Sequence, residues 1–161
     1  MTFKLSKRSL DRLEGVDERL QSVVKSAIHM TEIDFGVICG MRTVDEQRAL
    51  VKSGASQTMK SRHLEGKAVD LMAYVQTSEG SRACWELNVY DNIADAMAQA
   101  AKDAGVAICW GASWSTGTIP YPMDIRHWNG TMEDAMNAYI DKKRAMGKRA
   151  FMDGPHFELI D

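Results

Sequence analysis

The sequence contains little cysteine and no long hydrophobic run, and each absence excludes a class of protein. Three of its 161 residues are cysteine, and Cys39, Cys84 and Cys109 lie far apart without a Cys-x-x-Cys pair. They predict small buried thiols in a reducing compartment instead of a disulfide framework. No window approaches the roughly 20 apolar residues of a membrane-spanning helix, so we expect no membrane insertion.

An excess of charge of one sign is also lacking. Twenty basic residues stand against 22 acidic ones, for a formal net charge of -2 at pH 7. This balance favours neither nucleic acid nor an anionic membrane as a partner. The first eight residues carry positive charge but no apolar segment follows them, so the sequence predicts no signal peptide and synthesis in a cytoplasm.

The rest of the composition is that of an ordinary globular protein. Hydrophobic residues make up 45% of the chain and charged residues 26%, both close to globular averages. The length suits one domain over residues 1–161 with a real hydrophobic core. No internal repeat, low-complexity tract or linker divides it.

Hydrophobic periodicity and turn residues divide the chain into helices and strands. Ser6 is a predicted N-cap, and Thr43 forms a predicted capping box with Glu46. Gly66 is predicted to adopt a positive φ in a turn. We expect helices after Ser6 and Thr43 and at 17–30, 85–104 and 131–145; strands at 33–39, 68–74, 106–110 and 156–160; and polar loops at 53–62 and 76–84. Such alternation fits an α+β domain, and by itself also permits a parallel α/β sheet.

Two short stretches carry the residues of a predicted metal site. His63 and Asp70 lie in the stretch 61–70, and His156 lies in the stretch 153–159. Two imidazoles and one carboxylate suit Zn²⁺, and three protein ligands leave a fourth position for water, as in catalytic zinc sites. The two stretches would meet only after folding.

Other assignments compete with this one. Asp124 and His127 have the same Asp-x-x-His spacing as Asp153 and His156. Non-haem iron oxygenases also use two histidines and a carboxylate, but there the first histidine and the carboxylate are usually one residue apart. A third candidate is a metal-bearing module that binds a peptide or a protein partner without cutting it, and such a module would be expected to lack Asp153.

The two stretches also carry a family resemblance. Ser-Arg-His-Leu-x-Gly-x-Ala-Val-Asp-Leu and Asp-x-Pro-His-Phe-Glu-Leu resemble the zinc motifs of the D-alanyl-D-alanine carboxypeptidase-like peptidases, in particular the L-alanyl-D-glutamate endopeptidases of bacteriophage endolysins. Further similar segments follow in the same order, so that the resemblance spans nearly the whole chain: 5–10, 40–43 with Gln47, 54–56, and 110–111 with Trp114. Within this resemblance, Phe157-Glu158-Leu159 favours His156 over His127 as the ligand.

The resemblance implies a fold and an activity. The fold would be a small, mostly antiparallel sheet with helices packed on one side, with an insertion at about 115–152. The activity would be zinc-dependent cleavage of the L-alanyl-D-glutamate bond of the peptidoglycan stem peptide in host cell lysis. A D-alanyl-D-alanine carboxypeptidase is the alternative within the family. We expect a monomer that accumulates in the host cytoplasm and reaches the wall through a membrane lesion made by another protein.

The resemblance also implies roles for individual residues. Asp153 would be the catalytic base, because the matching acidic residue of the family takes a proton from water and passes it to the leaving amine. Arg42 would stabilise the reacting carbonyl. Gln47, Ser61 and Trp114 would contact the substrate.

Overall fold

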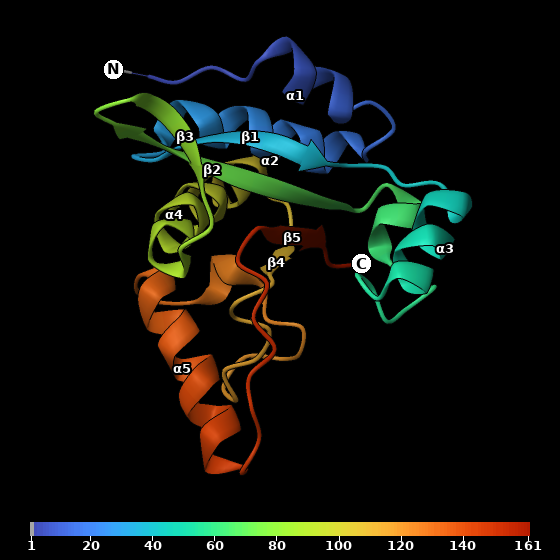
Figure 1. Cartoon of the computed structure of the whole chain (residues 1–161). Helices are drawn as coiled ribbons and strands as arrows, with labels where there is room; N and C mark the ends of the chain where they lie inside the picture. The colour runs from blue at the N-terminus through green and yellow to red at the C-terminus, as the bar shows by residue number, and fades with distance from the viewer. Residues whose placement is uncertain (1) are drawn as a thin grey trace.

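The computed structural model describes residues 2–161, and its sheet is antiparallel throughout (Figure 1). The strands run in the order β1-β2-β5-β4, and β3 also pairs with β2. Their bounds are β1 Asp34–Cys39, β2 Ala68–Thr77, β3 Gly80–Cys84, β4 Ile108–Trp110 and β5 His156–Leu159. The predicted α+β class is confirmed, and the parallel alternative is wrong.

The predicted helices form, and their caps are the expected ones. Ser6 accepts a hydrogen bond from the backbone of Ser9, and Thr43 and Glu46 make both bonds of the capping box. The helices are α1 Lys7–Arg12, α2 Glu18–Met30, α3 Val44–Ser53, α4 Leu87–Ala104 and α5 Met132–Ala145, with short 3-10 turns η1 Arg62–Glu65 and η2 Ile125–His127. No helix within residues 2–161 is long and apolar enough to cross a membrane.

The expected polar loop at 76–84 is wrong, because this segment is the second strand of a hairpin. β3 pairs with the end of β2 from Ala73↔Cys84 to Thr77↔Gly80, and the Thr77 hydroxyl donates to the carbonyl of Gly80 (2.7 Å). The middle of β3 is exposed. The strand therefore lacks the alternation of apolar and polar residues by which a half-buried strand is predicted.

Side-chain alternation gives the sheet two different faces. Val69, Leu71 and Phe157 are buried in the core, which α2 and α4 cover from behind the sheet in Figure 1. Successive side chains of a strand point to opposite faces. Asp70 and His156, the neighbours in sequence of these core residues, therefore point to the uncovered face.

Two smaller arrangements complete the frame around that face. The free edge of β1 is covered by α1, since the Ser9 hydroxyl accepts from the Val37 N–H and Arg12 donates to the Val37 carbonyl, both at 3.0 Å. Residues 115–152 contain η2 and α5, and α5 packs against α4. That this region is an insertion remains a prediction.

Candidate active site

The turn that carries His63 is fixed from both ends. The Ser61 hydroxyl accepts a hydrogen bond from the His63 backbone (3.2 Å), and the Arg42 backbone N–H donates to the His63 carbonyl (2.9 Å). Gly66 ends the turn with φ 69°, as predicted. A Cβ atom at Gly66 would overlap the carbonyl oxygen of Gly15, so this position needs glycine both for its conformation and for space.

Strand register brings the other residues to His63. Asp70 of β2 is directly opposite His156 of β5 on one side and opposite Cys39 of β1 on the other. Residues opposite one another in neighbouring strands have side chains within contact distance. Three segments far apart in sequence therefore meet beside η1.

The three predicted metal ligands lie together. Nε2 of His63 is 3.3 Å from one carboxylate oxygen of Asp70, and Nδ1 of His156 is 3.1 Å from the other. The two imidazole rings are 5.3 Å apart, edge to face. His63 is only 3% exposed, so its ring is held by packing as well as by these contacts.

The second nitrogen of each ring has its own acceptor. Nδ1 of His63 lies 2.8 Å from the Gly40 carbonyl, and Nε2 of His156 lies 2.8 Å from a carboxylate oxygen of Glu158. Neither a carbonyl nor a carboxylate oxygen can donate, so each of these nitrogens carries the proton. In the neutral rings the lone pairs of His63 Nε2 and His156 Nδ1 then face Asp70, and such outer contacts orient metal-binding histidines. Imidazole nitrogens and a carboxylate are donor types that zinc binds, although within residues 2–161 no group of possible metal ligands contains both histidines.

Glu158 contacts a predicted ligand, and the sequence alone assigned it no role of its own. The signal was its position two residues after His156 on the same strand, which places both side chains on one face.

Without a metal, the three predicted ligands form a charged cluster. Burial opposes charge on His63, but the hydrogen bond and charge of Asp70 outweigh it and raise the pKa of His63 to about 10. Burial likewise opposes charge on His156, and its contacts with Asp70 and Glu158 raise its pKa to about 9. Burial raises the pKa of the Asp70 carboxyl, but the hydrogen bonds and charges of His156 and His63 outweigh burial and hold that pKa well below its usual range.

Cys39 lies behind His63 and is only partly buried, whereas the sequence predicted a small buried thiol here. Its sulfur is 3.7 Å from Nδ1 of His63 and accepts from Arg42 at 3.2 Å. Burial raises the pKa of the Cys39 thiol, but His63 and Arg42 outweigh burial and lower it. Cys109, by contrast, is buried and its pKa is raised, as expected of an inert thiol.

Two groups of possible metal ligands therefore share Asp70. One is Cys39 with His63 and Asp70, and the other is Asp70 with Asp153 and His156. Cys39 faces the nitrogen of His63 that the Gly40 carbonyl already holds, whereas Asp70 faces both open nitrogens. The residues present can hold a metal ion, with Asp70 at the centre.

Arg42 and Gln47 form the wall next to Asp70. One guanidinium nitrogen of Arg42 is 3.8 Å from Asp70, and another donates to the amide oxygen of Gln47 at 2.7 Å. Gln47 is 0% exposed and donates to the Ser56 hydroxyl and the Thr58 carbonyl. In this structure Gln47, expected to contact substrate, lies behind Arg42 and holds both Arg42 and the loop at 56–58.

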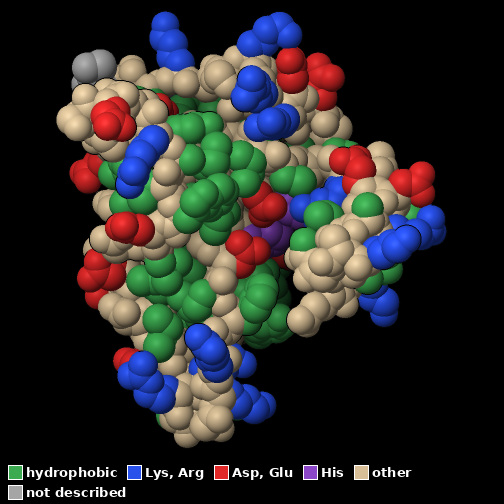
Figure 2. Space-filling view, in the orientation of Figure 1, with side chains coloured by type: hydrophobic (Ala, Val, Ile, Leu, Met, Phe, Trp, Pro, Cys, Tyr) green, Lys and Arg blue, Asp and Glu red, His purple; other side chains and the backbone are tan. Residues whose placement is uncertain are grey.

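All three predicted ligands line an open cleft of about 500 Å³, together with Arg42, Ser61 and Asp153. Figure 2 shows histidine, acidic and basic side chains gathered in one hollow beside the part of the molecule that carries α3. The Asp153 backbone donates to the Gly111 carbonyl (2.8 Å), and the indole of Trp110 donates to the Gly154 carbonyl (2.7 Å). Burial, with the charge of Asp70 next, raises the pKa of Asp153.

Of the remaining residues singled out in the sequence, Trp114 lies near the cleft and His127 lies outside it. The Trp114 ring is 5.7 Å from the ring of His156, at the rim. The side chain of His127 is 62% exposed and 3.8 Å from Asp124, and within residues 2–161 neither group of possible ligands includes it. The structure brings His156, not His127, to His63 and Asp70.

An antiparallel α+β domain with two histidines and two carboxylates in an open cleft is typical of a hydrolase with a potential metal site. Over residues 1–160 the chain matches the phage L-alanyl-D-glutamate peptidase family, and it belongs to that family. The predicted family and the predicted peptidase class are confirmed.

Individual relatives agree with this assignment. The chain is 27% identical over 164 residues to the L-alanyl-D-glutamate peptidase of Escherichia phage T5, which covers 99% of this chain and 100% of that protein. It is 30% identical over 118 residues to the L-alanyl-D-glutamate peptidase of Listeria phage A118, covering 71% of this chain and 40% of that protein. The crystal structure of Serratia marcescens L-Ala D-Glu endopeptidase ChiX superposes with a TM-score of 0.68 at 30% identity, covering 99% of this chain and 91% of that one.

Proposed function

We propose that this chain is a zinc-dependent phage endolysin that cuts the L-alanyl-D-glutamate bond of the peptidoglycan stem peptide. The observation that carries the proposal is the meeting of His63, Asp70 and His156 in a cleft that also contains Asp153. The relatives named above supply the substrate, since each is a peptidase for this bond by name.

His63 through Nε2, Asp70 through its carboxylate and His156 through Nδ1 would hold the ion. Zn²⁺ bound by three such ligands lowers the pKa of a water molecule to about 7 and polarises a carbonyl. The Gly40 carbonyl and Glu158 keep the two imidazoles in the tautomers that this requires. Cys39, on the far side of the His63 ring, stays outside the ligand set.

The chain's own residues supply the proton transfer and the charge stabilisation. Asp153 takes a proton from the attacking water and returns it to the leaving amine. Arg42, held by Gln47, donates to the carbonyl oxygen as negative charge develops there. Ser61, which lines the cleft, and Trp114, which lies beside His156, contact the substrate.

The variant Asp153→Asn tests this assignment. It keeps nearly the same shape and leaves all three ligands, so zinc should stay near one per chain. Release of new amino groups from purified peptidoglycan should fall by about 10² to 10⁴-fold, the usual contribution of a general base. Wild-type cleavage by Asp153→Asn with full zinc would remove Asp153 from the mechanism.

The bond that is cut separates this proposal from its alternatives. Mass spectrometry of digested sacculi should show new N-terminal D-glutamate. Release of free D-alanine instead would indicate a D-alanyl-D-alanine carboxypeptidase. Absence of cleavage on every sacculus chemotype, with the protein still bound to the wall, would indicate a zinc-bearing wall-binding module.

We further propose that the protein acts as a monomer, accumulating in the host cytoplasm and reaching the wall after another protein permeabilises the membrane. Membership of a phage peptidase family supports this route. Expression in host cells should leave them intact until a membrane-permeabilising protein is co-expressed, and lysis without it would contradict the proposal.

A further inference from the structure

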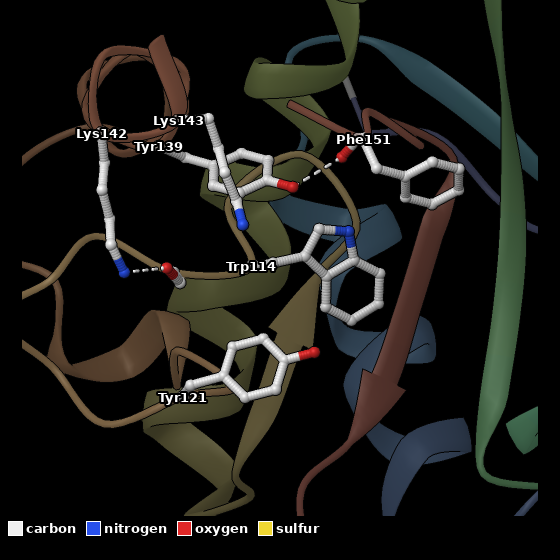
Figure 3. A pocket seen from close by; sticks show the side chains of 7 residues that line it. Trp114, Tyr121, Tyr139, Lys142, Lys143 and Phe151 are labelled. Atoms are coloured by element: carbon white, nitrogen blue, oxygen red, sulfur yellow. Dashed lines mark hydrogen bonds between the residues drawn. The ribbon is translucent and has the colours of Figure 1, made fainter. Parts of the chain in front are cut away.

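A second pocket, of about 460 Å³, opens beside the catalytic cleft. Its lining comes from the segment after β4, from α5 and from the segment before β5 (Figure 3): Trp114, Tyr121, Tyr139, Lys142, Lys143 and Phe151. We call it the aromatic-lysine pocket. Phe151 lines both cavities, and Trp114 lies against His156, so a substrate held at the metal site can extend into this pocket.

The pocket contains positive charge without a matching negative charge. Lys142 and Lys143 are both half-buried. Lys142 donates to the Ser115 hydroxyl, and across residues 2–161 neither lysine forms an ion pair with a carboxylate. Partial burial of an ammonium group without an anion is unfavourable, so the pocket is suited to receive one.

Aromatic side chains line the same pocket as these two lysines. Tyr121 is 74% exposed and Phe151 67% exposed, although both are large and partly apolar. Tyr139 is held in place, because its hydroxyl donates to the Phe151 carbonyl at 2.9 Å (Figure 3). Aromatic surface left open beside a cleft is typical of a binding site. The pocket therefore fits a group with an aliphatic stem and an anionic end.

Resting on the function proposed above, we propose that the aromatic-lysine pocket binds the carboxylate-bearing part of the stem peptide, on the D-glutamate side of the cut bond. D-Glutamate in the stem is linked through its γ-carboxyl, so its α-carboxylate is free, and the diamino acid that follows adds an aliphatic stem and can carry a further carboxylate. The lactyl carboxyl on the sugar side is consumed in an amide bond. The lysines thus orient the peptide, and the glycan lies toward the opposite end of the cleft, at residues 56–61.

A pair of substrates and a pair of variants test the orientation. The substrates are the tripeptide L-alanyl-γ-D-glutamyl-diaminopimelate and the same peptide with its free α-carboxylates amidated. Lys143→Met removes the charge and keeps the aliphatic stem. Lys148→Met is the matched control, because Lys148 is an exposed lysine that does not line the pocket.

Wild type and Lys148→Met should cleave the free acid with a kcat/KM about twofold to fivefold higher than the amide, as expected for one partly screened ion pair. Lys143→Met should reduce this preference to less than about twofold, mainly through KM. Preserved preference in Lys143→Met, or its loss in Lys148→Met, would overturn the proposal.

A binding measurement keeps the subsite separate from catalysis. The dipeptide γ-D-glutamyl-diaminopimelate, added to ¹⁵N-labelled protein, should shift amide signals of residues 114–121 and 139–151, and Lys143→Met should weaken this binding. If wild type cleaves neither tripeptide, the proposed function is wrong while this titration still decides the subsite. Shifts confined to residues 56–61, or N-acetylmuramic acid shifting residues 114–121 and 139–151 in place of the dipeptide, would overturn the orientation.

Discussion

The catalytic cleft and the aromatic-lysine pocket lie side by side but are constructed in opposite ways. In the cleft, polar groups hold one another: Asp70 contacts both histidines, and Glu158 holds His156 from outside. In the pocket, Lys143 forms no ion pair within the described chain, and the aromatic rims are open. A change in the cleft should therefore disturb several groups at once, whereas a change in the pocket should alter only substrate affinity.

The largest effect is expected at the centre of the cleft. Asp70→Ala removes the carboxylate that both histidines face, so bound zinc and peptidase activity should both be lost. His63→Ala and His156→Ala should have the same effect, because each removes one of three ligands. Metal analysis and amino-group release on the same samples measure both quantities.

His127→Ala is the matched control for these ligand variants, since His127 is an exposed histidine outside the cluster. It should retain full zinc and activity. Loss of zinc in His127→Ala with full zinc in His156→Ala would show that the ligand assignment is wrong.

A smaller effect on zinc binding is expected at Glu158, which contacts the predicted ligand His156. Glu158→Gln replaces the carboxylate that holds Nε2 of His156, so zinc affinity should fall by about 10 to 100-fold. Glu65→Gln is the control, because Glu65 and Glu158 both pair with Arg62 but only Glu158 reaches His156. Competition with a chromophoric chelator measures affinity, and equal affinities for the two variants would place Glu158 outside the site.

An alanine substitution in the turn between His63 and Asp70 should lower the free energy of unfolding more than the same substitution in an exposed turn with the same backbone conformation. Gly66→Ala introduces both positive-φ strain and overlap with the Gly15 carbonyl, for a loss of unfolding free energy of about 2 to 5 kcal/mol. Gly54 has φ 83° but open space around it, so Gly54→Ala should cost about 1 to 2 kcal/mol. Urea unfolding compares the two variants, and equal losses would mean that the contact with Gly15 is unimportant.

The smallest expected signal is the release of protons when zinc enters the cleft. In the metal-free protein the pKa values of His63 and His156 are about 10 and about 9, so both rings are protonated at pH 7. Ligation needs neutral imidazole, and zinc binding at pH 7 should therefore release about two protons. Calorimetry in buffers of different ionisation enthalpy measures this number.

The same raised pKa values predict that the stability of the metal-free protein falls as pH rises, whereas that of the zinc-loaded protein does not. Each protonated histidine stabilises the metal-free fold below its unfolded pKa of about 6.5, and this stability is lost as pH rises toward about 10. Zinc-loaded protein should not lose stability over that interval, because its two histidine ligands are already neutral. A metal-free melting temperature that is constant from pH 6.5 to pH 10 would contradict the charged cluster.

Sequence reasoning succeeded where a local pattern has a direct physical cause. The capping box at Thr43, the helix predicted at 17–30 and the positive φ of Gly66 each depend on residues close together in sequence. The family resemblance then indicated the antiparallel sheet, which alternation alone left open.

The contacts that sequence reasoning missed depend on strand register. Cys39 resembled any buried thiol until the pairing Cys39↔Asp70 placed it beside the site. Glu158 is adjacent to a predicted ligand in the motif, yet its bond to Nε2 of His156 depends on which way the ring is turned. β3 was missed because its exposed residues carry no hydrophobic pattern.

The central claim is that one metal ion is held by His63, Asp70 and His156, with Asp153 and Cys39 outside the ligand set. Anomalous diffraction at the zinc edge from crystals of the zinc-loaded protein tests it directly. The account predicts a single peak bonded to Nε2 of His63, to the Asp70 carboxylate and to Nδ1 of His156. A peak bonded to the sulfur of Cys39, or one that leaves out His156, would contradict it.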